Sequence, residues 1–318
     1  MAERPQRVLI TGGTGFVGRA VATRLERETD ITTLRGSRRM QEATVLTPDL
    51  EPFADWSGAL RGVDALVHLA ARVHVMNDTA RDPLKEFRRV NSVGTENLAR
   101  QAARAGVRRF VFVSSIKVNG EETPSGQPFT ERDLPSPVDP YSLSKLEAEQ
   151  VVARIGHETG MEFVIIRPPL VYGPGVGANF RRMMDWLSSG VPLPLGAIDN
   201  RRSLVAADNL ADLITAALVH PAARNETFLA ADGEDLSTTQ LLRRLGHALG
   251  RPARLFPVAP AVLSAVLSMT GKGVMTQRLL KSLQVDSSKA RALLSWTPPV
   301  SLDAGLRSAA VAYRGGSS

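Results

Sequence analysis

Short apolar runs alternate with amphipathic stretches through the first half of the chain. The apolar runs lie at residues 8–10, 31–34, 45–46, 65–68 and 110–113, and the periodicity predicts helices at residues 15–26 and 91–105. Strands connected in this order by helices favour right-handed crossovers and parallel pairing. The pattern therefore predicts an α/β fold, a doubly wound parallel sheet of the Rossmann type.

The second half of the chain has a different pattern of predicted elements. A polar loop at residues 121–137 leads to Asp139-Pro140, an N-cap followed by proline at the first helical position, and the helix is expected to end near residue 156 or 160. A sixth strand is predicted at residues 163–166, and shorter helices follow at residues 180–188, 207–219 and 238–249. We expect a first domain at residues 1–170. Residues 171–318 are expected to form mainly a smaller C-terminal substrate-binding lobe, with strands and helices able to return to the first domain.

The longest apolar stretch covers residues 255–269 and is interrupted by Pro257 and Pro260. It is shorter than the roughly 20 residues of a membrane-spanning helix, so stable membrane insertion is not expected. Two interpretations are open. The stretch is a buried helix of the lobe, which we favour, or a membrane-facing patch followed by Lys272, Arg278 and Lys281.

Composition narrows the class of protein. Hydrophobic residues make up 43% and charged residues 22%, which is typical of a globular protein. The absence of cysteine excludes disulfides, thiolate metal clusters and redox thiols, and indicates a reducing compartment. The N-terminus shows no signal-peptide pattern, so a cytoplasmic protein is expected.

The net charge of +7 suits nucleic acid, anionic lipid or a polyanionic small molecule. Acidic residues are interspersed and aromatic residues reach only 5%, so a nucleic-acid surface is not expected. No histidine pair or carboxylate cluster predicts a metal site, and no G-x-S-x-G motif predicts a serine nucleophile.

A glycine-rich turn follows the first strand directly. It reads Thr11-Gly12-Gly13-Thr14-Gly15-Phe16-Val17-Gly18 and opens the first helix. Glycines there permit a tight turn and close approach of a pyrophosphate, to which the helix N-terminus offers free N–H groups. The alternative, that the glycines serve chain geometry alone, is weaker in this strand-to-helix context. We predict dinucleotide binding by Gly12, Thr14, Gly15, Phe16 and Val17.

The end of the second strand bears on the choice between NAD and NADP. An acidic residue there would accept the ribose hydroxyls and repel a 2′-phosphate, whereas this chain has Arg35, with Arg38 and Arg39 nearby. Guanidinium groups pair with phosphate through two hydrogen bonds, which favours NADP over NAD. The alternative is a solvated basic loop.

Tyr141 and Lys145 lie four residues apart on the capped helix, so both project from one face. A tyrosine pKa is near 10, and lowering it by about three units requires about 4 kcal/mol, which an ammonium and an oxidised nicotinamide could supply. We expect Tyr141 to be the acid or base, Ser115 to hydrogen-bond the same substrate oxygen, and Lys145 to hold the nicotinamide ribose. The competing interpretation is an exposed salt-bridging helix face. For His68 and His74 a packing or loop role is expected.

These residues resemble the extended short-chain dehydrogenase/reductase family, of the NAD-dependent epimerase/dehydratase type. Within it, the chain is similar to the branch of UDP-galactose 4-epimerase and the 4-keto sugar reductases of surface-polysaccharide assembly. The resemblance spans nearly the whole chain. Beyond the motifs above, it is carried by Asp49-Leu50, His68-Leu69-Ala70-Ala71, Asn91, Gly94-Thr95, Ser114-Ser115, Val171-Tyr172-Gly173-Pro174 and residues 286–296.

The resemblance implies roles for further residues. Asp49 and Leu50 would border the adenine, Leu69, Ala70 and Ala71 would line the dinucleotide cleft, and Pro168 would lie beside the nicotinamide. The full implied cofactor set adds Asn91, Ser114, Tyr141 and Lys145. On the substrate side, Arg202 would bind a diphosphate. The other implied substrate contacts are Ser115, Lys117, Tyr141 and Asn179.

Two departures from the family pattern affect the expected reaction. The epimerases usually carry an asparagine after the sixth strand, where this chain reads Arg167-Pro168-Pro169-Leu170. Dehydratases place acidic residues after the serine, where this chain has Ile116-Lys117. Together with Arg35, this favours reduction of a UDP-4-keto-6-deoxy(amino)sugar at C4. A UDP-hexose 4-epimerase, a non-catalytic dinucleotide sensor and a small-carbonyl reductase remain alternatives, and relatives suggest a homodimer.

Overall fold

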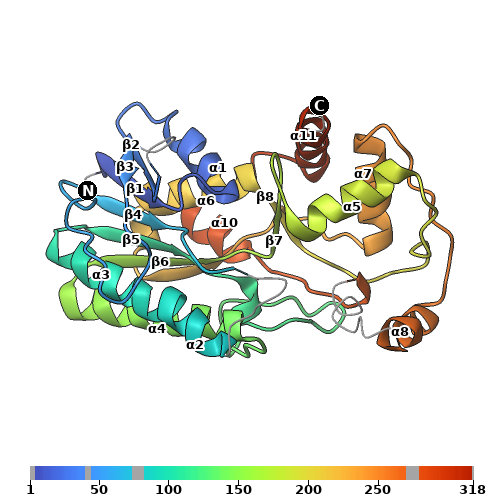
Figure 1. Cartoon of the computed structure of the whole chain (residues 1–318), viewed down its shortest axis with the longest axis horizontal. Helices are drawn as coiled ribbons and strands as arrows, with labels where there is room; N and C mark the ends of the chain where they lie inside the picture. The colour runs from blue at the N-terminus through green and yellow to red at the C-terminus, as the bar shows by residue number, and fades with distance from the viewer. Residues whose placement is uncertain (1–3, 40–43, 74–81, 270–278, 317–318) are drawn as a thin grey trace.

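A parallel sheet runs through the N-terminal half of the protein, which we describe from a computed structural model covering residues 4–39, 44–73, 82–269 and 279–316. Its strands follow the order β3-β2-β1-β4-β5-β6-β9, and every pairing is parallel. The Rossmann-type prediction is confirmed (Figure 1). The strands are β1 (Arg7–Thr11), β2 (Thr32–Ser37), β3 (Val45–Leu46), β4 (Ala65–His68), β5 (Arg109–Val113), β6 (Glu162–Arg167) and β9 (Glu226–Leu229).

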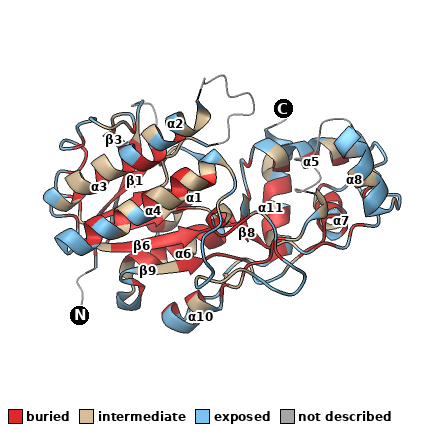
Figure 2. Ribbon diagram, turned by 90° about the horizontal axis from the view of Figure 1, so that it is seen from below, coloured by how far each residue is buried: buried red, intermediate tan, exposed pale blue. Residues whose placement is uncertain are grey.

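Successive side chains of each strand point to opposite faces of the sheet, and each face has its own hydrophobic core. Val8 and Ile10 of β1 belong to the layer shared with α1 (Phe16–Leu25) and α6 (Ala207–Val219), whereas Leu9 belongs to the opposite layer with α3 (Thr95–Arg104) and α4 (Pro140–Thr159). Because both faces are covered, the central strands are buried throughout (Figure 2).

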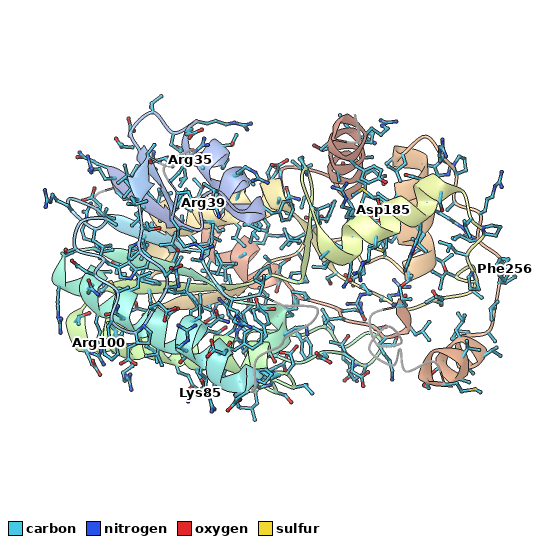
Figure 3. The ribbon with its side chains drawn as sticks, viewed as in Figure 1. Arg35, Arg39, Lys85, Arg100, Asp185 and Phe256 are labelled. Atoms are coloured by element: carbon cyan, nitrogen blue, oxygen red, sulfur yellow. The ribbon has the colours of Figure 1, made fainter. Side chains whose placement is uncertain are left out.

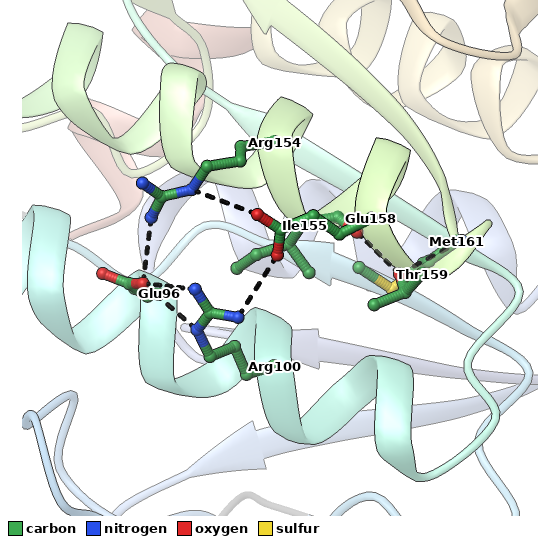
Figure 4. Close-up of polar contacts among 7 residues, drawn as sticks. All are labelled: Glu96, Arg100, Arg154, Ile155, Glu158, Thr159 and Met161. Atoms are coloured by element: carbon green, nitrogen blue, oxygen red, sulfur yellow. Dashed lines mark hydrogen bonds and ion pairs between the residues drawn. The ribbon is translucent and has the colours of Figure 1, made fainter.

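Ion pairs join the outer surfaces of α3 and α4. Glu96 accepts from Arg100 at 2.9 Å and from Arg154 at 3.0 Å, and Arg100 also reaches Glu158 at 3.4 Å (Figure 4). These exposed pairs contribute little individually. They join α3 to α4, the helix that carries Tyr141. The buried side chains Ala148, Val152 and Ile155 of α4 pack into the core beneath.

Helix α3 is preceded by an irregular turn that the sequence did not predict. A short α2 (Pro83–Phe87) runs through a π-helical segment, η1 (Arg88–Gly94), into α3, so the expected helix at residues 91–105 is the end of a longer run. Single π-helical turns commonly occur at functional sites. Here the turn carries Asn91.

The C-terminal lobe has its own core. It contains α5 (Ala178–Ser189), α7 (Thr238–Ala248) and α11 (Leu302–Gly315), with a two-stranded parallel ribbon of β7 (Leu170–Tyr172) and β8 (Leu204–Ala206). The remaining elements are the short helices η2 (Ile116–Val118) and η3 (Pro221–Ala223), and α10 (Ser288–Leu294). Helix α6 packs on α1 and strand β9 pairs with β6, so the chain returns to the sheet after residue 170.

A buried polar network fixes the start of the lobe. Asp232 accepts from the Tyr172 hydroxyl at 2.8 Å and from the Asn209 amide at 2.7 Å. Asn209 also pairs with the backbone of Val300 in both directions. The motifs around Tyr172 and Asn209 therefore hold β7, β8 and α6 together.

The buried-helix interpretation of residues 255–269 is wrong. Helix α8 (Pro260–Met269) lies at the far end of the lobe, and Val262 and Val266 are 54% and 52% exposed (Figure 1). The physical reason is that α5, α7 and α11 already enclose the lobe core, and α8 contributes chiefly Leu263 to it. Within the described residues, no helix is long and apolar enough to cross a membrane.

Candidate active site

The turn between β1 and α1 requires glycine at particular positions. Gly12 has φ +68°, and a Cβ there would lie 3.0 Å from the backbone nitrogen of Ala70. A Cβ on Gly18 would lie 2.1 Å from the Gly12 carbonyl oxygen. Helix α1 starts after Gly15 with no side chain capping its N–H groups and no acidic residue in its first turn. The turn is thus a cradle for an anion, as the motif predicts.

The other residues of this turn contribute in different ways. The Thr14 carbonyl accepts a 2.7 Å hydrogen bond from Arg19. Phe16 packs against the core of the lobe and Val17 against the sheet core, so only their backbone faces the cradle. The Phe16 contact places the lobe next to the dinucleotide turn.

Arg35 lies beside the glycine turn, because a Cβ on Gly13 would come within 3.2 Å of the Arg35 Cα (Figure 3). Its guanidinium donates to Glu26 at 3.0 and 2.5 Å, near the surface. Arg38 pairs with Asp49 at 2.8 Å, and both side chains are exposed. Asp49 therefore lies at the basic end of β2, next to the buried Leu50.

The segment after β4 forms a wall of the same cleft. Leu69, Ala70 and Ala71 are half-buried, and the N–H of Ala70 donates to the Thr11 hydroxyl at 3.3 Å. Asn91 fixes the next residue, Arg72, because its amide accepts from the Arg72 N–H at 2.7 Å and donates to the Arg72 carbonyl at 3.0 Å. The π-helical turn thus holds this wall in place.

Ser114 and Ser115 follow β5 and behave differently. The Ser114 hydroxyl is buried and has no hydrogen-bond partner in the described structure. The Ser115 hydroxyl is hydrogen-bonded to the Tyr141 hydroxyl. The N–H of Ile116 donates to the carbonyl of Pro168 at 2.9 Å, so the residue after β6 lies against this serine turn.

Tyr141 and Lys145 are positioned by the start of α4. Asp139 and Ser142 form a reciprocal capping box at the helix N-terminus. One turn into the helix, the Lys145 ammonium donates to the Val113 carbonyl at 2.8 Å and lies 4.0 Å from the centre of the Phe112 ring. The structure therefore gathers Ser115, Tyr141 and Lys145 at the carboxyl end of β5.

The protein's own groups raise the pKa of Tyr141, so the lowering expected from the sequence would require the oxidised nicotinamide. Burial and the Asp139 charge together raise the pKa of Tyr141 to about 12, and the Ser115 hydrogen bond opposes them. Burial also lowers the pKa of Lys145 to about 7, against the charge of Glu149. With a pKa of about 7 the Lys145 ammonium is only partly charged at neutral pH, and it is hydrogen-bonded to the Val113 carbonyl.

Lys117 is engaged at the helix cap. Its ammonium reaches Asp139 at 2.6 Å and Glu121 at 2.9 Å. This pairing keeps the pKa of Asp139 below its ordinary value despite burial. Lys117 therefore lies next to the start of α4, and its charge is directed at the helix cap.

His74 lies outside the described residues, whereas His68 is a core residue. The ring nitrogens of His68 lie 2.6 Å from the Thr11 hydroxyl and 3.0 Å from the Thr95 hydroxyl, and the ring stacks on Phe112. Burial and the nearby Lys145 charge lower the His68 pKa to about 3. The expected packing role matches this placement.

Sequence reasoning missed a buried ion pair below the site. Arg167 donates to Glu149 of α4 at 2.5 Å and to the Asn119 amide oxygen at 2.9 Å. Arg167 therefore points inward and ties β6 to α4. One signal in the sequence could have indicated this ion pair. Glu149 is a charged residue four positions beyond Lys145, close to the Tyr-x-x-x-Lys motif on the same helix.

Arg202 and Asn179 belong to the lobe. The Arg202 guanidinium donates to the Lys281 carbonyl at 2.9 Å, and its backbone pairs with Leu236 and Leu283. Asn179 lies half-buried in the first turn of α5. The hydrogen bonds of Arg202 tie it to other segments of the lobe, whereas Ser115, Tyr141 and Lys145 gather at the end of β5.

The described residues fit a nicotinamide dinucleotide. The glycine cradle has no room for Cβ atoms, the α1 N-terminus is uncapped, and the buried Ser114 hydroxyl lacks a partner beside the Tyr141 helix. The first two features suit a pyrophosphate, and the third suits a polar group deeper in the cleft.

The chain belongs to the NAD dependent epimerase/dehydratase family, whose model matches residues 8–231. It is thus an enzyme of the extended short-chain dehydrogenase/reductase type, with a nicotinamide dinucleotide as cofactor, as the sequence predicts.

Individual relatives come from more than one branch. The chain is 42% identical over 316 residues to a Vibrio cholerae protein named UDP-glucose 4-epimerase, covering 98% of this chain and 96% of the relative. It is 30% identical over 270 residues to a 3-beta-hydroxysteroid dehydrogenase of Mycolicibacterium neoaurum, covering 77% and 70%. The structure of UDP-N-acetylglucosamine 4-epimerase from Bacillus cereus matches with a TM-score of 0.79, at 22% identity, covering 98% and 100%, which shows the shared fold. Nucleotide-sugar chemistry of the epimerase/dehydratase type is thereby supported.

Proposed function

We propose that this enzyme reduces the 4-keto group of a UDP-4-keto-6-deoxy(amino)sugar for surface-polysaccharide synthesis, with NADPH as the preferred cofactor. The observation that carries the proposal is the group formed by Ser115, Tyr141 and Lys145 at the carboxyl end of β5. Such a group can hold and protonate one oxygen while the carbon bearing it is reduced.

The roles of the residues follow from their positions. When bound, the nicotinamide ring supplies the hydride that adds to C4. The Tyr141 phenol, protonated at neutral pH, gives its proton to the former carbonyl oxygen, and the Ser115 hydroxyl donates a hydrogen bond to the same oxygen. The addition of one hydride and one proton converts the ketone into an alcohol. Lys145, tied to the Val113 carbonyl, is placed to contact the nicotinamide ribose.

The preference for NADPH rests on the end of β2. Arg35 lies beside the glycine turn, and the residues that follow it on β2, Gly36 and Ser37, carry no carboxylate. The Arg35 guanidinium forms an ion pair with the surface carboxylate of Glu26, which a 2′-phosphate could replace. A reductase that exchanges its spent cofactor would use this preference.

A second candidate is a UDP-hexose 4-epimerase, favoured by the 42% identity to the Vibrio cholerae protein of that name. An epimerase would return the hydride to the opposite face of C4 without net consumption of cofactor. Purified protein should therefore be incubated with UDP-hexoses and, separately, with UDP-4-keto-6-deoxy sugars in the presence of NADPH or NADH. Stoichiometric loss of reduced-cofactor absorbance supports the reductase, and interconversion of hexoses without that loss supports the epimerase.

We propose that Arg202 binds the diphosphate of the substrate, with Lys117 and Asn179 as further substrate contacts. The role of Arg202 can be tested separately. UDP or dTDP should inhibit turnover competitively, and Arg202→Ala should abolish this competition. Arg201→Ala, an exposed neighbour, should leave it intact. Indifference to both nucleotides would instead indicate a small-carbonyl reductase, and dinucleotide binding without turnover of any of these substrates would indicate a sensor.

A further inference from the structure

Helix α8 presents an apolar stripe at the outer end of the lobe. Val262, Val266 and Met269 are 54%, 52% and 88% exposed, and their spacing of four and three residues places them on one face. Leu263, about 100° around the helix from Val262, packs against the lobe core. The helix therefore contacts the core through Leu263, and most of its surface, with the valine and methionine stripe, is exposed (Figure 2).

A further exposed apolar side chain lies in the segment before the helix. Phe256 is 45% exposed at the outer edge of the lobe (Figure 3). Its backbone pairs with Leu193 and Gly196, so the segment is held on the lobe and the aromatic ring still reaches solvent. Phe256, Val262, Val266 and Met269 thus expose four large apolar side chains at this end of the lobe, and exposed apolar surface gathered in one region typically marks an interaction surface.

The chain segment that contains α8 carries formal charge of one sign, although Arg244 and Lys281 pair with carboxylates from outside the segment. Residues 236–285 contain seven lysines and arginines and no aspartate or glutamate. Arg251 and Arg254, between α7 and α8, are exposed, and neither forms an ion pair with a described carboxylate. The basic residues of this segment are Arg243, Arg244, Arg251, Arg254, Lys272, Arg278 and Lys281.

We propose that α8, with Arg251 and Arg254 before it, is a docking surface for an anionic phospholipid bilayer, on which the helix lies in the plane of the interface. Apolar side chains on one helical face enter the headgroup boundary, while arginine and lysine side chains pair with lipid phosphates. A second copy of this chain is a poorer occupant, because two acid-free basic segments would repel each other. The docking is independent of the reaction proposed above.

The apolar contribution is tested by cosedimentation of the full-length protein with vesicles of phosphatidylcholine alone and with an equal share of phosphatidylglycerol. The protein should bind the anionic vesicles preferentially. Val262→Asp with Val266→Asp should weaken this binding by about tenfold or more per residue, because burial of a valine side chain is worth about one decade of affinity. Val311→Asp on α11, where the valine is 60% exposed, is the matched control and should bind normally.

The electrostatic contribution is tested by Arg251→Glu with Arg254→Glu. Each basic residue at an anionic surface contributes about fivefold, so this variant should bind at least about 25-fold more weakly, and added salt should weaken the unaltered protein. Arg132→Glu, an exposed arginine outside the segment, should bind as the unaltered protein does.

Three outcomes would overturn the proposal. One is equal binding to both vesicle types, or to neither. Another is undiminished binding by the Val262 and Val266 variant. The third is dissociation of an oligomer by that variant with no change in vesicle binding, which would make the stripe an interface between copies. Circular dichroism and the thermal midpoint verify that each variant is folded, and NADPH binding verifies that the cofactor domain is intact.

Discussion

Arg167 and Glu149 form an ion pair at 2.5 Å that is almost entirely buried, with side chains 8% and 5% exposed. The pair joins β6, whose end leads to Pro168, to α4, which carries Tyr141 and Lys145. The pair links the strand beside the expected nicotinamide position to the helix that carries Tyr141, the proposed proton donor. The relationship leads to a first prediction about stability.

Glu149→Ala should lower the free energy of unfolding by about 3–5 kcal/mol, because the Arg167 guanidinium would stay buried without its partner. The same helix offers a matched control in Glu147, whose partner Arg88 is 47% exposed. Glu147→Ala should cost about 1 kcal/mol or less. Urea denaturation of both variants measures the difference, and equal losses would show that burial of the pair is unimportant.

Tyr141→Phe should reduce turnover by about 10²- to 10⁴-fold, because it removes the proton donor while leaving the helix and its cap intact. Cofactor binding, followed by quenching of protein fluorescence, should change little. Tyr313→Phe is the control: this tyrosine is near the surface and donates to Asp185 at 2.7 Å. Full turnover in Tyr141→Phe would refute the proposed mechanism.

Acid should destabilise the protein through His68. Its pKa is about 3 in the folded state against an ordinary value of 6.5, so the unfolded chain takes up the proton first. The stability contributed by the neutral ring is complete above pH 6.5 and falls by about 1.4 kcal/mol per pH unit as the pH drops toward 3. Thermal unfolding across this range should give a shallower slope for His68→Gln, and an unchanged slope for the exposed His247→Gln.

Arg35→Ser should raise the KM for NADPH by about 10- to 100-fold, because hydrogen bonds from a guanidinium to a phosphate are charge-assisted. The KM for NADH should remain nearly constant, since NADH has no 2′-phosphate. Arg61→Ser, at an exposed position away from β2, serves as the control. A parallel rise for both cofactors would indicate that Arg35 contacts a part they share.

Local patterns in the sequence determined the framework of the site. The alternation of strands and helices predicted the parallel sheet, the glycine turn predicted the cradle between β1 and α1, and Asp139-Pro140 predicted the start of α4. The four-residue spacing placed Tyr141 and Lys145 on one face. These features depend on neighbours within a few residues, which is why they could be read without coordinates.

Only the tertiary structure decided the features that depend on distant segments. Burial between packed layers sets the direction of the Tyr141 and Lys145 pKa shifts in the protein without its cofactor. The partner of Arg167 lies 18 residues earlier in the chain, on α4, and β9 returns to the sheet from the second half of the chain. The exposure of α8 follows from the space that α5, α7 and α11 leave in the lobe. Desolvation and charge pairing depend on which segments come into contact in the folded chain. A local pattern of residues does not specify those contacts.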